Sequence, residues 1–67
     1  AAKHPAFGSA DICLLTEGNI EEIKVEVESK GIEIEVGIVQ RQGAQGAIRS
    51  IYFRDPDGNL IEVSTLI

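Results

Sequence analysis

Short apolar runs separated by turn residues predict four β-strands in this chain. Residues 10–16 are mostly apolar, which suits a strand covered on at least one face. Residues 32–36 alternate strictly between apolar residues and glutamates, so they are interpreted as a half-buried strand with its glutamates outward. Residues 48–54 are rich in β-branched and aromatic side chains, and residues 60–65 form the last predicted strand. The turn sequence DPDGN between them, residues 55–59, predicts a hairpin.

A helix is predicted between the first two strands. Asn19 followed three positions later by Glu22 is a variant of the capping box, and Gly31 is a typical residue just after a helix end. Residues 23–28 also alternate with a period of two, which is the spacing of a strand. The cap, the stop signal and the length together favour the helix, and on this interpretation Val25 is exposed.

Two further segments show neither the helical period nor the period of two that is typical of a strand. Residues 1–8 are interpreted as an arm or linker. Residues 40–47 contain two glycines and no large apolar residue, which indicates a mobile loop. The predicted order is therefore β-α-β-β-β in one α+β domain over residues 9–67.

Composition limits the size of the core and the kinds of partner. A chain of 67 residues buries only about 60% of the surface that its unfolded form exposes. Cys13 is the only cysteine, so a metal or a partner subunit, rather than a disulfide, is expected to add stability. The net charge of −5 and the dispersed basic residues argue against nucleic acid as a partner. With neither a membrane-spanning apolar run nor a recognisable secretory leader, a cytoplasmic protein without membrane association is expected.

The segment IYFRDPDGNLIEV, residues 51–63, carries a resemblance to a known family. Together with the β-α-β-β-β order, it resembles the signature of the vicinal oxygen chelate superfamily, which contains glyoxalases, bleomycin-resistance proteins and extradiol dioxygenases. Residues 4–13 and 43–50 look like the second half of small glyoxalase-domain proteins related to lactoylglutathione lyase. The resemblance covers nearly the whole chain and implies that residues 1–8 are an inter-module linker.

The resemblance implies that this chain is half of a curved barrel. The family's usual unit sets two such modules side by side around one divalent metal ion, with two ligands from each module. Either an N-terminal module is missing from this chain, or two copies pair as a homodimer. In the homodimer, two Asp11 and two Glu62 carboxylates would face one cavity, a set suited to magnesium, manganese or calcium. Nickel and zinc are further candidates for the ion.

Glu62 and Asp11 are the metal ligands that the resemblance implies. Glu62 matches the family's glutamate ligand on the last strand, where it would also act as general base on a substrate proton. Its alternative interpretation is an exposed strand glutamate. Asp11 stands where histidine or glutamine is more usual in the family. Its alternative is a strand-end aspartate that accepts backbone N–H bonds or pairs with Arg49.

Arg49 is the candidate substrate-binding residue. If the hairpin closes over residues 55–58, Arg49 lies on the same face as Glu62 and can hold an anionic substrate group. Pairing of Arg49 with Glu62 or Asp11 is the alternative.

Other residues with possible chemistry have simpler interpretations. His4 and Cys13 lack a second ligand at a metal-binding spacing, so His4 is interpreted as a linker residue and Cys13 as a small core residue. The glutamates between residues 17 and 35 are interpreted as a solvated outer face rather than a calcium site.

These observations lead to three functional hypotheses. The first is a module of a metal-dependent glyoxalase-like lyase or isomerase that acts on a small oxygenated substrate and is active only when paired. The second is a metal-free dimeric module that binds a small molecule, as in some resistance proteins, and it rests on the missing histidine at position 11. The third is a self-associating half-barrel without activity.

Overall fold

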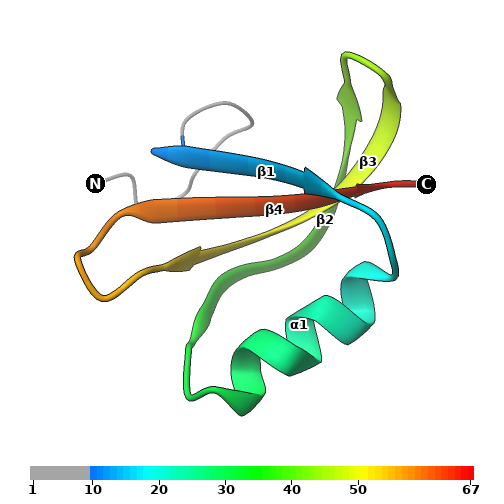
Figure 1. Ribbon diagram of the computed structural model, residues 1–67. Helices are drawn as coiled ribbons and strands as arrows, with labels where there is room; N and C mark the ends of the chain where they lie inside the picture. Colours follow the sequence, from blue (N-terminus) through cyan, green and yellow to red (C-terminus); the bar gives the residue numbers. More distant parts are fainter. Residues whose placement is uncertain (1–9) are drawn as a thin grey trace.

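One helix covers one face of a four-stranded mixed sheet in the computed structural model, which describes residues 10–67 (Figure 1). The order of elements is the predicted β-α-β-β-β. Along the sheet the strands are ordered β1-β4-β3-β2, with β1 parallel to β4 and the other neighbours antiparallel. The elements are β1 (Ile12–Thr16), α1 (Ile20–Ser29), β2 (Ile34–Gly43), β3 (Gly46–Arg54) and β4 (Leu60–Leu66).

Helix α1 begins and ends at the signals that the sequence contains. The side chain of Asn19 accepts hydrogen bonds from the backbone N–H groups of Glu21 and Glu22, at 2.8 and 3.3 Å. Gly31 follows the helix with a φ of 80°, a conformation that glycine adopts without strain. Val25 is 63% exposed, so the helical interpretation of residues 23–28 is confirmed. Within residues 10–67, no helix is long and apolar enough to cross a membrane.

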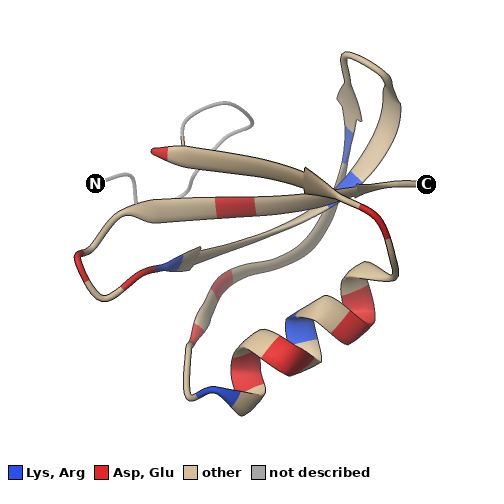
Figure 2. Cartoon of the chain, viewed as in Figure 1, with Lys and Arg blue, Asp and Glu red and all other residues tan. Residues whose placement is uncertain are grey.

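The hydrophobic core lies between α1 and the sheet. Ile20 from the helix packs with residues of the two central strands, Ile51, Ile61 and Val63. Partly buried apolar side chains extend this cluster along α1, β2 and β3: Ile23, Val27, Ile34, Ile38 and Phe53. The acidic side chains of α1 are exposed, as the outer-face interpretation predicted. Figure 2 marks their positions along the helix in red.

The prediction of a mobile loop over residues 40–47 is wrong. Strands β2 and β3 pair as far as Gly43 and Gly46 and are joined by a two-residue turn. Strand β2 lies at the sheet edge, where Gln40 and Gln42 stay exposed, so the segment needs no large apolar residue to form a strand. Gly46, with a φ of 125°, supplies the backbone conformation at the end of the turn.

The second face of the sheet carries no helix within residues 10–67. Cross-strand register places Cys13, Glu62 and Tyr52 side by side on it, and Ser64 opposite Ser50 on the same face one step along. We call this the open face, and it also includes Leu15, Val39, Arg41, Ile48, Leu60 and Leu66.

Ile51→Val tests the core position on the helix side. Ile51 is fully buried, so loss of one methylene is expected to lower the free energy of unfolding by about 0.5–1.5 kcal/mol. Val25→Ala is the control, because Val25 is exposed and the change should stay within about 0.5 kcal/mol. Urea denaturation measures both, and equal losses for the two variants would contradict this packing.

Candidate functional site

Glu62 is a buried carboxylate at the centre of the open face. Its alternation with Ile61 and Val63, which face α1, directs it to the side of Ser64, as predicted. It is only 1% exposed, so the alternative of an exposed strand glutamate is wrong. A buried carboxylate needs hydrogen-bond donors to offset its lost hydration.

Two serines and a thiol supply those donors. The hydroxyls of Ser50 and Ser64 lie 3.2 and 3.3 Å from Oε2 of Glu62, and the two hydroxyl oxygens are 2.6 Å apart. Each hydroxyl has a single hydrogen, so at most two of these three oxygen–oxygen contacts are hydrogen bonds at any one time. The Glu62 carboxylate thus keeps acceptor capacity for a further donor or a metal ion.

Cys13 is exposed, so the prediction of a small core residue is wrong. It stands opposite Glu62 on β1, whose one neighbouring strand among the described residues is β4. Its Sγ lies 3.3 Å from Oε1 of Glu62. Desolvation first, then the hydrogen bond to Glu62 and its negative charge, raise the pKa of the Cys13 thiol above its ordinary value. The thiol is therefore a donor to Glu62 and a poor nucleophile.

Tyr52 and Arg41 also belong to this face, although neither was predicted as a site residue. Tyr52 stands opposite Glu62 and is fully buried. Burial and the charge of Glu62 raise the pKa of its phenol above the ordinary value, while the charge of Arg41 acts in the opposite direction. The sequence would have identified Tyr52 only if the alignment of β3 with β4 had been known, because that alignment decides which residue lies opposite Glu62.

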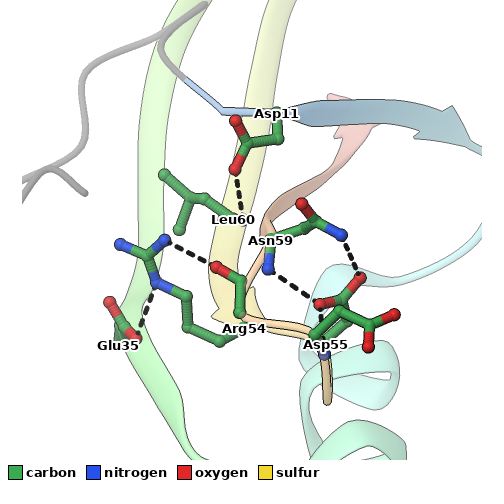
Figure 3. A network of polar contacts seen from close by, with 8 residues as sticks. Asp11, Glu35, Arg54, Asp55, Asn59 and Leu60 are labelled. Atoms are coloured by element: carbon green, nitrogen blue, oxygen red, sulfur yellow. Dashed lines mark hydrogen bonds and ion pairs between the residues drawn. The ribbon is translucent and has the colours of Figure 1, made fainter.

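Asp11 is held by the backbone of β4. Its Oδ2 accepts a hydrogen bond of 2.8 Å from Leu60 N (Figure 3). Its own backbone N–H donates to Leu60 O at 2.9 Å. Asp11 thus accepts a backbone N–H bond at the end of a strand, which was the alternative to its interpretation as a metal ligand. Asp11 lies one residue before β1, and no hydrogen bond joins its carboxylate to that of Glu62 in the part of the chain that the structure describes.

The expectation that Arg49 shares a face with Glu62 is wrong. The β3–β4 hairpin closes over residues 55–59 rather than 55–58, with Arg54 opposite Leu60. One additional loop residue shifts the register by one position, and such a shift moves a side chain to the other face. Arg49 therefore lies on the helix side, where its Nη1 is 3.5 Å from Oε1 of Glu21.

The longer loop is held by Asp55. Its Oδ1 accepts from the backbone N–H groups of Asp57 and Asn59, and its Oδ2 accepts from the Asn59 side chain at 3.0 Å (Figure 3). The side-chain bond of Asn59 is the main reason that the pKa of Asp55 lies below its ordinary value. Arg54 adds a bond to Gly58 O and an ion pair with Glu35. This loop therefore sets the register that brings Tyr52 beside Glu62.

A hollow of about 210 Å³ lies on the open face beside Glu62. Leu14, Leu15, Ile48 and Leu66 give it apolar walls. Its polar lining residues are Gln45, Glu62 and Ser64, together with the Cys13 thiol. The turn between β2 and β3 closes one side. The site is therefore an apolar recess with one buried carboxylate.

No group of three or more His, Cys, Asp or Glu side chains within residues 10–67 is arranged to hold a metal ion. Glu62 and Asp11 can supply at most two of the ligands that such an ion needs. His4, interpreted from the sequence as a linker residue, lies outside the described residues.

Comparisons with known proteins agree with this architecture. The model of the Glyoxalase/Bleomycin resistance protein/Dioxygenase superfamily matches residues 9–63. The chain is 50% identical over 66 residues to virulence protein STM3117 of Salmonella typhimurium, covering 98% of this chain and 46% of that protein. It is 44% identical over 61 residues to the glyoxalase domain-containing protein RDO1 of Mycosarcoma maydis, covering 91% of this chain and 35% of that protein.

Solved structures show the same module. The crystal structure of STM3117 superposes with a TM-score of 0.79 at 49% identity, covering all of this chain and 53% of that one. An integron cassette protein from the mobile metagenome of V. cholerae gives a TM-score of 0.76 at 55% identity, covering 96% of this chain and 50% of that one. The chain thus spans about half of each solved structure, and less than half of the two relatives.

Alkylation of Cys13 tests its contact with Glu62. Because the pKa of the thiol is raised, iodoacetamide should react more slowly at pH 8 than with a free cysteine peptide. Glu62→Gln removes the charge and should accelerate the reaction, by up to about tenfold for each pKa unit that the charge contributes. Glu33→Gln, at an exposed glutamate, is the control and should leave the rate unchanged. Equal rates for wild type and Glu62→Gln would refute the contact.

Proposed function

Because the chain belongs to the glyoxalase/bleomycin resistance protein/dioxygenase superfamily, we propose that it is one half of a metal-dependent glyoxalase-like lyase or isomerase. Its substrate would be a small oxygenated molecule, and the site would be active only when paired with a second module. The observation that carries this proposal is the buried Glu62 carboxylate, which keeps acceptor capacity beside an apolar hollow.

The donor set fits half of a divalent metal site. Glu62 lies on the open face, and Asp11, just before the neighbouring strand β1, has one carboxylate oxygen that no hydrogen bond within residues 10–67 occupies. Both offer hard oxygen ligands, and the other ligands would come from the second module. When bound, the ion would polarise a substrate oxygen. Glu62 would accept the substrate proton, and the walls of the hollow would exclude water from it.

Strand β1 supports the pairing. All five of its residues are exposed, including Ile12, Leu14 and Leu15 at 42, 52 and 53%. Its outer edge leaves backbone N–H and C=O groups without a neighbouring strand in the described part of the chain. A second module, either another copy or an N-terminal half of a longer chain, would cover both this strand and the open face.

Light scattering tests pairing by a second copy. The 7.2 kDa chain is expected to elute as a dimer of twice that mass, because the exposed apolar residues of β1 need cover. Leu14→Lys should shift the species toward monomer by placing a charge at the interface. Val25→Lys, on the exposed side of α1, is the matched control and should remain dimeric. A monomeric wild type would leave an N-terminal module as the required partner.

Metal-dependent stabilisation tests the proposed site. In the paired protein, free Mg²⁺, Mn²⁺, Ca²⁺, Ni²⁺ or Zn²⁺ at about 100 times its Kd should add about 2.7 kcal/mol to the free energy of unfolding. Glu62→Gln should abolish the effect, and Asp11→Asn should weaken it. Glu33→Gln should leave it intact, since this glutamate is exposed and does not line the hollow. Thermal shift and bound-metal analysis measure the response, and stabilisation that persists in Glu62→Gln would refute the site.

A metal-free dimeric module that binds a small molecule is the second candidate function. The observation that favours it is Asp11, whose Oδ2 is already engaged by Leu60 N, together with the apolar walls of the hollow. Ligand binding that survives chelation of metals would favour this function. Loss of activity on a hemithioacetal after chelation would favour the first, and absence of both would leave an inactive half-barrel.

A further inference from the structure

Among the described residues that line the hollow, Glu62 is the one that carries a charge. The other lining residues are uncharged, and apolar side chains supply most of the wall. A recess of this kind holds a small ligand through its apolar part, while its few polar groups decide which head group fits. The class of ligand therefore depends on what the Glu62 carboxylate still needs.

The hydrogen bonds that Glu62 receives come from neutral groups. Its Oε2 contacts the hydroxyls of Ser50 and Ser64, and its Oε1 contacts the thiol of Cys13. A thiol is a weak donor, and the two oxygens of a carboxylate can accept about four hydrogen bonds between them. Oε1 therefore has room for a stronger donor. Because Glu62 and the exposed Cys13 both line the hollow, a ligand held there is within reach of this oxygen.

No lysine or arginine within residues 10–67 forms an ion pair with Glu62. Arg41 acts on the neighbouring Tyr52 hydroxyl, but it does not line the hollow. At 1% exposure, the Glu62 carboxylate has lost most of its hydration, and a buried charge is costly unless it is paired. A cationic donor that enters the hollow would supply both the missing charge and the missing hydrogen bond.

We propose that the hollow binds a small primary amine, with its protonated amino group at Oε1 of Glu62 and its apolar group against the walls. This inference deepens the second candidate function and rests on it, because an ammonium group and a divalent ion would both use Glu62. A hydrogen bond between an ammonium group and a carboxylate is roughly twice as strong as one between neutral groups. Shielding from water strengthens it further.

Three ligands of similar shape and different charge test the proposal: 3-methylbutylamine, 3-methylbutan-1-ol and 3-methylbutanoate. The full chain, labelled with ¹⁵N, is titrated at pH 7 in a metal chelator and followed by NMR. The amine should bind at least about tenfold more tightly than the alcohol, because it alone offers a charged donor, and the carboxylate should bind most weakly. The amide signals of Leu14, Ile48 and Leu66 should shift. Equal binding of amine and alcohol, or no binding of the amine, would overturn the proposal.

Variants separate the contact with Glu62 from general electrostatics. Glu62→Gln should weaken binding of the amine about tenfold or more and leave binding of the alcohol within about twofold. Glu33→Gln is the matched control, because it removes the same charge from an exposed position that does not line the hollow. Equal losses of amine binding in these two variants would assign the preference to the net charge of −5 and overturn the contact.

The apolar part of the ligand has its own variant. Leu66 is 47% exposed and lines the hollow, so Leu66→Ala should weaken the amine and the alcohol alike, severalfold, without changing the ratio between them. Unchanged binding of both compounds would place the ligand outside the hollow. The NMR spectrum of each variant reports whether it is folded, and the charge series on the wild type decides the proposal without any variant.

Failure of this inference and failure of the candidate function give different results. Binding of the alcohol without a preference for the amine would keep a small-molecule site and remove the amine from it. Absence of binding by all three compounds would remove both the site and the amine. Metal-dependent stabilisation that requires Glu62, with no amine binding in the chelator, would overturn the inference and favour the metal-dependent function.

Discussion

The double pairing of β4 is the constraint on which the rest of this structure depends. Its parallel contact with β1 and its antiparallel contact with β3 bring Cys13 and Tyr52 to either side of Glu62. The same two contacts place Ile61 and Val63 under α1, so the core and the site are the two faces of one strand. A change of register in either pairing would exchange these faces and bury the wrong set of side chains.

Local patterns were sufficient to predict most of the fold. Asn19 and Gly31 mark the ends of α1 because capping depends on a few adjacent residues. The strands were predicted from the alternation of residues 32–36 and from the β-branched and aromatic side chains of residues 48–54. The extension of β2 and β3 through residues 40–47 was not predicted, because this ladder depends on backbone pairing and leaves the polar side chains of an edge strand in water.

The site was harder to predict because it depends on a single loop residue. Glu62 was identified by its family resemblance and its orientation by alternation along one strand. Its neighbours depend on how β3 and β4 align, and the hydrogen bonds from Asn59 to Asp55 lengthen the loop by one residue. The shorter loop of residues 55–58 led to the expectation that Arg49 lies on the open face. Tyr52 and Arg41 lie there instead. Cys13 was expected in the core because its apolar neighbours do not show that β1 lies at an uncovered edge.

The contact between Cys13 and Glu62 joins residues that are 49 positions apart. Closing a loop of that length costs chain entropy before any contact repays it, so β1 is expected to join the sheet late in folding. The carboxylate site is therefore assembled in the same step that closes the chain. Any ligand that contacts both β1 and β4 would stabilise their pairing, and its binding would therefore slow the unfolding of the whole module.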